Sequence, residues 1–286
     1  MNKFIKITSI VFLVVVTASC SKSSSTDTQQ VAQTSQSSGR DSFTMASEDD
    51  FTVRLADDGT AIITGYIGSG GNVAFPAVIQ GVQVTEIGNG EGRIASISLD
   101  LTGVQLPEGI KVINDYAFDG SSISAIIIPN TVTSIGNGAF RRCRNLESIS
   151  IPDSVRIFGG YIFLGSGLKS FTIPAGMIAM NEIITNMFEE STLEKIVIPE
   201  GIENIRHYVF RDCKNLASVT LPSTIKFIGY EVFDGCSNLT EVIVPESVTK
   251  IDFYIYQGRH NSFGGCSKLN LASQARLKQL GYTGNL

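Results

Sequence analysis

The segment LEKIVIPEGIENIRHYVFRDCKNLASVTLPSTIKFIGYEVFDGCSNL, residues 193–239, contains the same phrase twice. In each half, apolar residues stand one, three and six positions before a proline, and a phenylalanine stands eleven positions after it. Seven of the eight prolines belong to such a phrase, at intervals of 22, 23, 22, 25, 23 and 23 residues: Pro107, Pro129, Pro152, Pro174, Pro199, Pro222 and Pro245. Self-similarity at a fixed period of about 20–50 residues is typical of stacked repeats. The pattern therefore predicts one repeat array, although 286 residues alone suggest roughly two domains.

The repeat unit reads L-x-x-I-x-I-P-x-x-V-x-x-I-G-x-x-A-F-x-x-C-x-x-L and predicts one short strand that ends at the proline. The second half is expected to turn back through a glycine such as Gly136, Gly159 or Gly229, which relieves a tight bend. It then places a phenylalanine in the interior: Phe118, Phe140, Phe163, Phe188, Phe210, Phe233 and Phe263. No single unit can bury these side chains alone, so we expect the coils to stack into continuous apolar columns.

These phrases, together with LESISIPDSVRIFGGYIF at residues 146–163, resemble the BspA-like leucine-rich repeats of bacterial surface proteins. The resemblance covers residues 101–269. It implies a right-handed leucine-rich-repeat superhelix, a solenoid with short parallel strands on one side and otherwise irregular structure. Members of that family are associated with adhesion to host extracellular proteins and with contacts between bacteria. Seven coils with strands about 4.7–4.9 Å apart would form an array of roughly 35 Å.

The ends of the array carry capping signals. Residues 51–66, FTVRLADDGTAIITGY, alternate on both sides of Asp58-Gly59 and predict a β-hairpin. Residues 70–88 form a degenerate first coil, so residues 49–100 make up the N-terminal cap and residues 101–271 the seven repeats. Ser273 to Leu280, followed by Gly281, predicts a short helix within a C-terminal cap at residues 272–286.

The N-terminus predicts export and lipid anchoring. Residues 1–19 combine two lysines, an apolar run and small residues before Cys20, which is typical of a secretory signal. Thr17-Ala18-Ser19-Cys20 resembles the lipobox of bacterial lipoproteins, which makes Cys20 the expected site of lipidation; an ordinary cleaved signal is the alternative. Residues 20–48 are rich in Ser, Thr and Gln and are expected to be a flexible tether with a reach of roughly 30 Å. We therefore expect an outer-membrane protein held only by its lipid anchor, exposed at the cell surface rather than facing the periplasm.

Charge and motifs exclude several classes of function. Without Lys3 and Lys6 the net charge is 20 − 27 = −7, and the absence of a basic patch argues against nucleic acid as a partner. The chain has two histidines and no catalytic motif, so no enzymatic activity, cofactor or metal is expected. His207 stands at a variable position of its repeat and is expected to be solvated.

Four cysteines share one slot, three residues after a repeat phenylalanine: Cys143, Cys213, Cys236 and Cys266. Ser121, Ser166 and Ser191 fill this slot in other coils. Buried free thiols are the preferred interpretation. A disulfide, Cys213–Cys236 or Cys236–Cys266, and a metal site are the alternatives.

Candidate binding residues come from two regions. If the apolar strand positions point inward, the residues two before each proline point outward: Gln105, Ile127, Ser150, Thr172, Val197, Thr220 and Ile243. With the small residues four before each proline they form a flat face of low charge, suited to protein or glycan. The last coil carries seven extra residues and includes Phe253, Tyr254, Tyr256, Arg259 and His260, which either bind a partner or cap the array.

The expected function is therefore macromolecular binding by a monomeric, non-catalytic envelope lipoprotein, in adhesion or protein–protein interaction. The partner would be a protein, host extracellular matrix included, or a glycan. The alternative is a periplasm-facing structural or assembly component of an envelope or glycan-uptake complex. The first acidic residue after Cys20 is Asp27, behind Ser21-Lys22-Ser23-Ser24-Ser25, and this late position favours the alternative.

Overall fold

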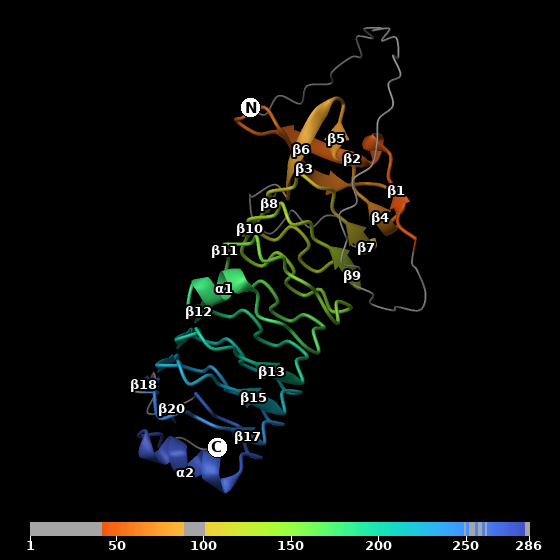
Figure 1. Ribbon diagram of the computed structural model, residues 1–286. Coiled ribbons are helices and arrows are strands. Elements are labelled where there is room, and N and C mark those ends of the chain that lie inside the picture. Colours follow the sequence, from red (N-terminus) through yellow and green to blue (C-terminus); the bar gives the residue numbers. More distant parts are fainter. Residues whose placement is uncertain are drawn as a thin grey trace, which may run out of the picture. The chain divides into compact units, whose positions relative to one another are not determined.

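The computed structural model describes residues 42–88, 101–248, 250–251, 255–256, 259–260 and 262–283. The described residues belong to one compact unit, Asp41–Leu286. Within this unit successive coils stack with their strands in parallel, and the array is a β-solenoid of the leucine-rich-repeat class, as the periodicity predicts (Figure 1).

One column of parallel strands, the first ladder, lies just before the prolines. Pairing puts residues of the same repeat position opposite each other, for example Ile196 opposite Val219. The ladder consists of two sections, and the coils of Pro152 and Pro174 lie between them. Its strands are β1 (Thr44–Met45), β4 (Gly71–Ala74), β7 (Leu101–Gln105), β9 (Ala125–Ile127), β13 (Lys195–Val197), β15 (Ser218–Thr220) and β17 (Glu241–Val242).

A second ladder, which the repeat phrase did not predict, lies in the other half of each coil. Most of its strands occupy the fifth and sixth residues after the proline, so the chain makes two short strands per coil instead of one. These strands are β2 (Phe51–Leu55), β3 (Ala61–Tyr66), β6 (Val82–Ile87), β8 (Val112–Ile113), β10 (Ser134–Ile135), β11 (Ile157–Phe158), β12 (Glu182–Ile183), β14 (Asn204–Ile205), β16 (Phe227–Ile228) and β18 (Lys250–Ile251). Two-residue strands are too short to show the alternation by which a strand is recognised in sequence.

The repeat phenylalanines form the predicted interior column, and all seven are fully buried. Neighbouring rings stack nearly parallel, with Phe118 and Phe140 centroids 5.6 Å apart and Phe188 and Phe210 centroids 5.7 Å apart. The rings thus repeat close to the spacing of the strands, because the coils that carry them are superimposed.

Glycines in the second half of the coil serve close packing rather than bending. A Cβ on Gly159 would lie 2.3 Å from the Asn137 nitrogen, and a Cβ on Gly136 would lie 2.5 Å from the Asp115 nitrogen. Both neighbours are backbone atoms of the preceding coil. φ is not positive at Gly136 or Gly159, so these positions need glycine because the backbones of stacked coils use the space that a missing Cβ leaves.

Left-handed backbone occurs instead on either side of the phenylalanine. Two positions before it, φ is positive at Tyr116, Gly138, Tyr161, Asn186, Tyr208 and Glu231. Two positions after it, φ is positive at Gly120, Arg142, Gly165, Glu190, Asp212, Gly235 and Gly265. The coil geometry requires this conformation whether or not the residue is glycine, at a cost of about 1–2 kcal/mol for each residue that carries a Cβ.

The N-terminal cap starts earlier than residue 49. β1 pairs in parallel with β4, and the 3₁₀ helix η1 (Glu48–Asp50) follows, so residues 44–48 belong to the folded array rather than to a tether. The hairpin predicted at residues 51–66 is present as the antiparallel pair β2–β3. β5 (Val78–Ile79) pairs antiparallel with β6 in the degenerate first coil.

The C-terminal cap is the helix α2 (Leu271–Gln279), close to the predicted bounds. Asn270 caps it by accepting a hydrogen bond from the Ser273 backbone, and Gly281 follows with φ +89°. Leu277 and Tyr282 are buried, and Tyr282 packs edge-on against Phe263. The helix therefore covers the last coil's apolar column.

Two coils depart from the period. The three extra residues after Pro174 accommodate the short helix α1 (Ala175–Ala179), and Met177 and Met187 are fully buried there. The last coil contains the antiparallel pair β19 (Ile255–Tyr256) and β20 (Arg259–His260). The described part of the longer coil is thus an antiparallel strand pair.

Candidate interaction surface

The outer column of the first ladder consists of the residues two before each proline. All seven of them are exposed: Gln105, Ile127, Ser150, Thr172, Val197, Thr220 and Ile243. The residues on either side, such as Val219 and Leu221, are buried. Strand alternation produces this arrangement, because successive side chains of a strand point to opposite faces.

Three apolar side chains dominate this column. The exposed fractions of Ile127, Val197 and Ile243 are 48%, 64% and 69%. Hydroxyl side chains lie between them, at Ser150, Thr172 and Thr220. At about 4.7–4.9 Å per coil, Ile127 and Val197 lie roughly 14 Å apart. This surface is broad and combines apolar with hydroxyl side chains, so it is suited to contact with another macromolecule.

The column four residues before each proline extends this face. Ala125, Ser148, Ser170, Lys195, Ser218 and Glu241 are exposed as expected. Gly103 was expected to point outward as well, but it is buried, since Asn72 and Phe43 of the preceding segments lie over it. The face therefore begins at the coil of Pro129 and continues to the coil of Pro245.

Aromatic side chains gather beside the second ladder, and the sequence did not reveal this. His207 and Tyr230 stack with ring centroids 4.0 Å apart, and Tyr208 meets Tyr230 edge-on at 4.7 Å. His207 Nδ1 accepts a hydrogen bond from the Tyr230 backbone. His207 is therefore half-buried and structural, and the expectation of a solvated histidine was wrong. These residues occupy variable slots of the repeat, so only superposition of the coils brings them together.

A charged column follows the phenylalanines. The residue directly after each of them is Asp119, Arg141, Leu164, Glu189, Arg211, Asp234 or Gly264. Arg141 donates two hydrogen bonds to Asp119, at 3.0 and 2.6 Å. The alternating signs in this slot were a signal that could have been found in the sequence, because stacked coils place these residues side by side.

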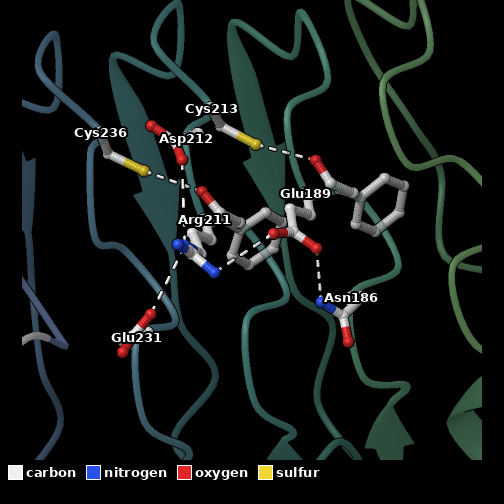
Figure 2. A network of polar contacts seen from close by, with 9 residues as sticks. Asn186, Glu189, Arg211, Asp212, Cys213, Glu231 and Cys236 are labelled. Carbon is white, nitrogen blue, oxygen red and sulfur yellow. Dashed lines mark hydrogen bonds and ion pairs between the residues drawn. The ribbon is translucent and has the colours of Figure 1, made fainter. Parts of the chain in front are cut away.

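Arg211 is the centre of the larger part of this column (Figure 2). Its guanidinium lies 3.6 Å from Glu189 and 3.4 Å from Glu231. Burial, together with the neighbouring carboxylates of Glu231 and Asp212, raises the pKa of Asp234 to about 6. Burial likewise raises the pKa of Glu189. The positive charge of Arg211 thus offsets the negative charges of several partly buried carboxylates. We interpret this cluster as structural.

The shared cysteine slot holds free, buried thiols, and the disulfide alternatives do not occur. Each thiol donates to the carbonyl of the preceding coil's phenylalanine, as Cys213 Sγ does to Phe188 O at 2.9 Å and Cys236 Sγ to Phe210 O at 3.0 Å (Figure 2). Burial raises the pKa of Cys143, Cys213 and Cys266 to about 12 and that of Cys236 well above 9.0. These thiols are therefore hydrogen-bond donors within the core rather than nucleophiles.

The described residues contain no group of three His, Cys, Asp or Glu side chains placed to hold a metal ion. Two depressions lie on the described surface, and neither is lined by a residue of the outer column. One, of about 430 Å³, is lined by Met45, Asp50, Tyr66 and their neighbours; the other, of about 360 Å³, by Glu190, Asp212 and Lys214. Within the described part of the chain, no helix has the length and hydropathy to cross a bilayer.

Several predicted site residues lie outside the described residues. Phe253 and Tyr254 are among them, as is Cys20. For Tyr256, Arg259 and His260 the structure describes the backbone of the β19–β20 hairpin and not the side chains. Whether the hairpin binds or caps stays a prediction.

Comparison with known proteins gives one family and several solved structures of similar fold. The model of the BspA type leucine-rich repeat region matches residues 96–184 and 181–270, with six copies. The crystal structure of a T. pallidum leucine-rich repeat protein is 27% identical, with a TM-score of 0.55, and the alignment covers 85% of this chain and 98% of that one. A leucine-rich repeat protein from Bacteroides ovatus is 22% identical, with a TM-score of 0.59 and coverage of 78% and 69%. No curated protein matches the chain.

Proposed function

Because the chain belongs to the BspA-type leucine-rich repeat family, we propose that it is a non-catalytic lipoprotein of the cell envelope whose repeat array binds other macromolecules. Adhesion or protein–protein interaction at the cell surface is the expected use. The observation that carries this proposal is the continuous exposure of the outer column, from Ile127 to Ile243. A rigid, flat and weakly charged strand face offers area for a partner and no machinery for a reaction.

Lipid anchoring rests on Thr17-Ala18-Ser19-Cys20 alone. Two measurements test it: the mass of the mature N-terminus, which should carry acyl groups on Cys20, and a Cys20→Ala variant, which should leave the membrane fraction. Retention of Cys20→Ala in the membrane would contradict the anchor.

The family resemblance favours surface display over a periplasm-facing role. The first acidic residue after Cys20 is Asp27, and this late position favours the periplasm-facing role instead. Proteinase treatment of intact cells, with a periplasmic protein as control, separates them. Loss of the array while the control survives supports surface display. Protection until the outer membrane is broken would exclude adhesion and direct the search to periplasmic partners.

The binding face is tested by charged substitutions. Ile127→Glu, Val197→Glu and Ile243→Glu together place three carboxylates on the outer column, at positions exposed enough to leave folding intact. The matched control is Ile157→Glu, since Ile157 is 63% exposed but lies on the second ladder. Against a panel of extracellular matrix proteins and glycans, the triple variant should lose at least about tenfold in affinity. Equal binding by the triple variant and the parent would exclude the face.

A further inference from the structure

The two ends of the array carry opposite charge. Residues 42–88, which include the terminal strands β1 and β2, contain six carboxylates and one arginine, a net charge of −5. Residues 262–283, which include α2, contain three basic residues, Lys268, Arg276 and Lys278, and no acidic one. The N-terminal cap and α2 lie at opposite ends of the stack (Figure 1). The array is therefore an electrostatic dipole along its stacking direction.

The outer face of α2 is also less polar than a terminal cap requires. Leu271 is 83% exposed, and Ala272, Ala275, Lys278 and Gln279 are exposed with it. At 3.6 residues per turn these five positions share one face of the helix. The opposite face is occupied, because Ser273 Oγ bonds to both Val242 N and Val242 O, and Arg276 bonds to Val244 O and Pro245 O. End caps of repeat arrays are normally polar on the outside.

The N-terminal end has the matching properties. Of the eleven large exposed apolar side chains in the described residues, five lie in this cap: Met45, Val53, Leu55, Ile67 and Val78. The same cap carries exposed carboxylates, among them Asp49 and Asp57. β1 and β2 have a strand neighbour on one side only among the described strands. This end thus combines exposed apolar side chains with acidic ones, whereas α2 combines them with basic ones.

We propose that the N-terminal cap of one copy docks on α2 of a second copy, so that the arrays associate head to tail. The two ends have opposite charge, and both expose apolar side chains. Two copies of the same end carry like charge and repel each other, which disfavours head-to-head pairing. Such a contact is heterologous and adds copies in an open row. The area offered by a nine-residue helix is small, so the contact is weak in dilute solution. On a membrane that holds the chain by its N-terminus, as proposed above, local concentration strengthens it.

The contact uses the caps and leaves the first-ladder face free. It therefore adds to the proposed binding function without depending on it. A row of copies would align their outer columns into one longer surface, which increases avidity for an extended partner.

The test is sedimentation velocity on the full chain, as its host cell processes it, in mild detergent from micromolar to submillimolar concentration. The parent should associate progressively, and high salt should weaken the association because exposed charges are screened. Asp49→Lys with Asp57→Lys, and separately Lys268→Glu with Lys278→Glu, should each weaken self-association roughly tenfold. The control is Arg144→Glu with Lys214→Glu, exposed residues of the middle coils, which changes the net charge by the same amount as Lys268→Glu with Lys278→Glu and should associate like the parent.

Mixing the two end variants gives the decisive result. One variant keeps the parental α2 end and the other keeps the parental N-terminal end, so the mixture should form pairs through these two unaltered ends, which neither variant can form alone. A parent that stays monomeric throughout, end variants that associate like the parent, or a mixture that stays monomeric would overturn the proposal. Unchanged thermal melts of the variants exclude misfolding as the cause.

Discussion

At the scale of single residues, buried thiols link each coil to the one before it. Cys143, Cys213, Cys236 and Cys266 each donate to a phenylalanine carbonyl of the preceding coil, at 2.9–3.1 Å. The donor is useful only in its protonated form. Ser121 and Ser191, in the same slot, instead lie 3.4 Å from the sulfur of the next coil. The slot is therefore a small polar column inside an apolar core.

Stability should fall in alkaline solution because of these thiols. The pKa of Cys213 is raised to about 12 from 9.0 in the folded chain, so between these values the unfolded chain loses a proton that the folded chain keeps. The contribution is complete below pH 9 and is lost as the pH rises toward 12, at about 1.4 kcal/mol per pH unit and thiol. Urea unfolding of the parent and of Cys213→Ser at increasing pH measures it. The serine variant should show a shallower slope, and equal slopes would contradict the assignment.

Glycine at the coil contact is a second constraint on single residues. Gly159→Ala places a Cβ against Gly136 and Asn137 backbone atoms of the preceding coil, and should lower the free energy of unfolding by about 1–3 kcal/mol or more. Gly120→Ala is the comparison, because Gly120 has φ +71° but no atom within 4 Å of the added Cβ. It should cost only the backbone strain, about 1–2 kcal/mol. Denaturant melts that rank Gly120→Ala as the more damaging would refute the close-packing account.

At the scale of elements, each array end is closed differently. The N-terminal hairpin extends the second ladder by strand pairing, and α2 covers the first ladder's other end through side chains. Ser273 supplies the donor and acceptor that the next strand would have supplied to Val242. Such covering prevents an open strand edge from pairing with another chain.

Deletion of residues 272–286 should therefore cause aggregation. It exposes the Val242 backbone, Phe263 and the ends of the apolar columns, since Leu277 and Tyr282 are lost with α2. Light scattering and a thermal melt of the truncated chain check this. Leu271→Ser, a change confined to the outer face of the helix, should leave both unchanged. A soluble truncated chain with a cooperative melt would show that α2 is not the cap.

At the scale of the whole molecule, stability comes from contacts between neighbouring coils. The number of coils can therefore change, but the alignment of equivalent repeat positions from one coil to the next cannot. Deletion of residues 130–152 joins Pro129 to Asp153 and removes one full period with Phe140. Phe118 can then stack on Phe163, and the apolar columns remain continuous. The shortened chain should stay soluble and melt cooperatively at a lower temperature.

Deletion of residues 130–141 is the contrasting case, because it removes half of a coil and shifts every later column out of phase. That chain should fail to fold, as circular dichroism and proteolysis would show. If both deletions behaved alike, stacking in register would not be what holds the array together.

The sequence by itself determined the repeat, its phase, the interior phenylalanine column and the outward direction of Ile127, Val197 and Ile243. These properties are periodic, and a period is visible in one dimension. It also located both caps, since hairpin and helix signals are local.

Only the tertiary structure decided which residues of different coils meet. The second ladder, the close approach at Gly159, the His207–Tyr230 stack and the Arg211 carboxylate cluster each depend on contacts between residues twenty or more positions apart. The burial of Gly103 under Asn72 and Phe43 is of the same kind. Stacking turns a variable position of the repeat into a column of neighbours, and the properties of that column follow from the superposition of coils rather than from any one phrase.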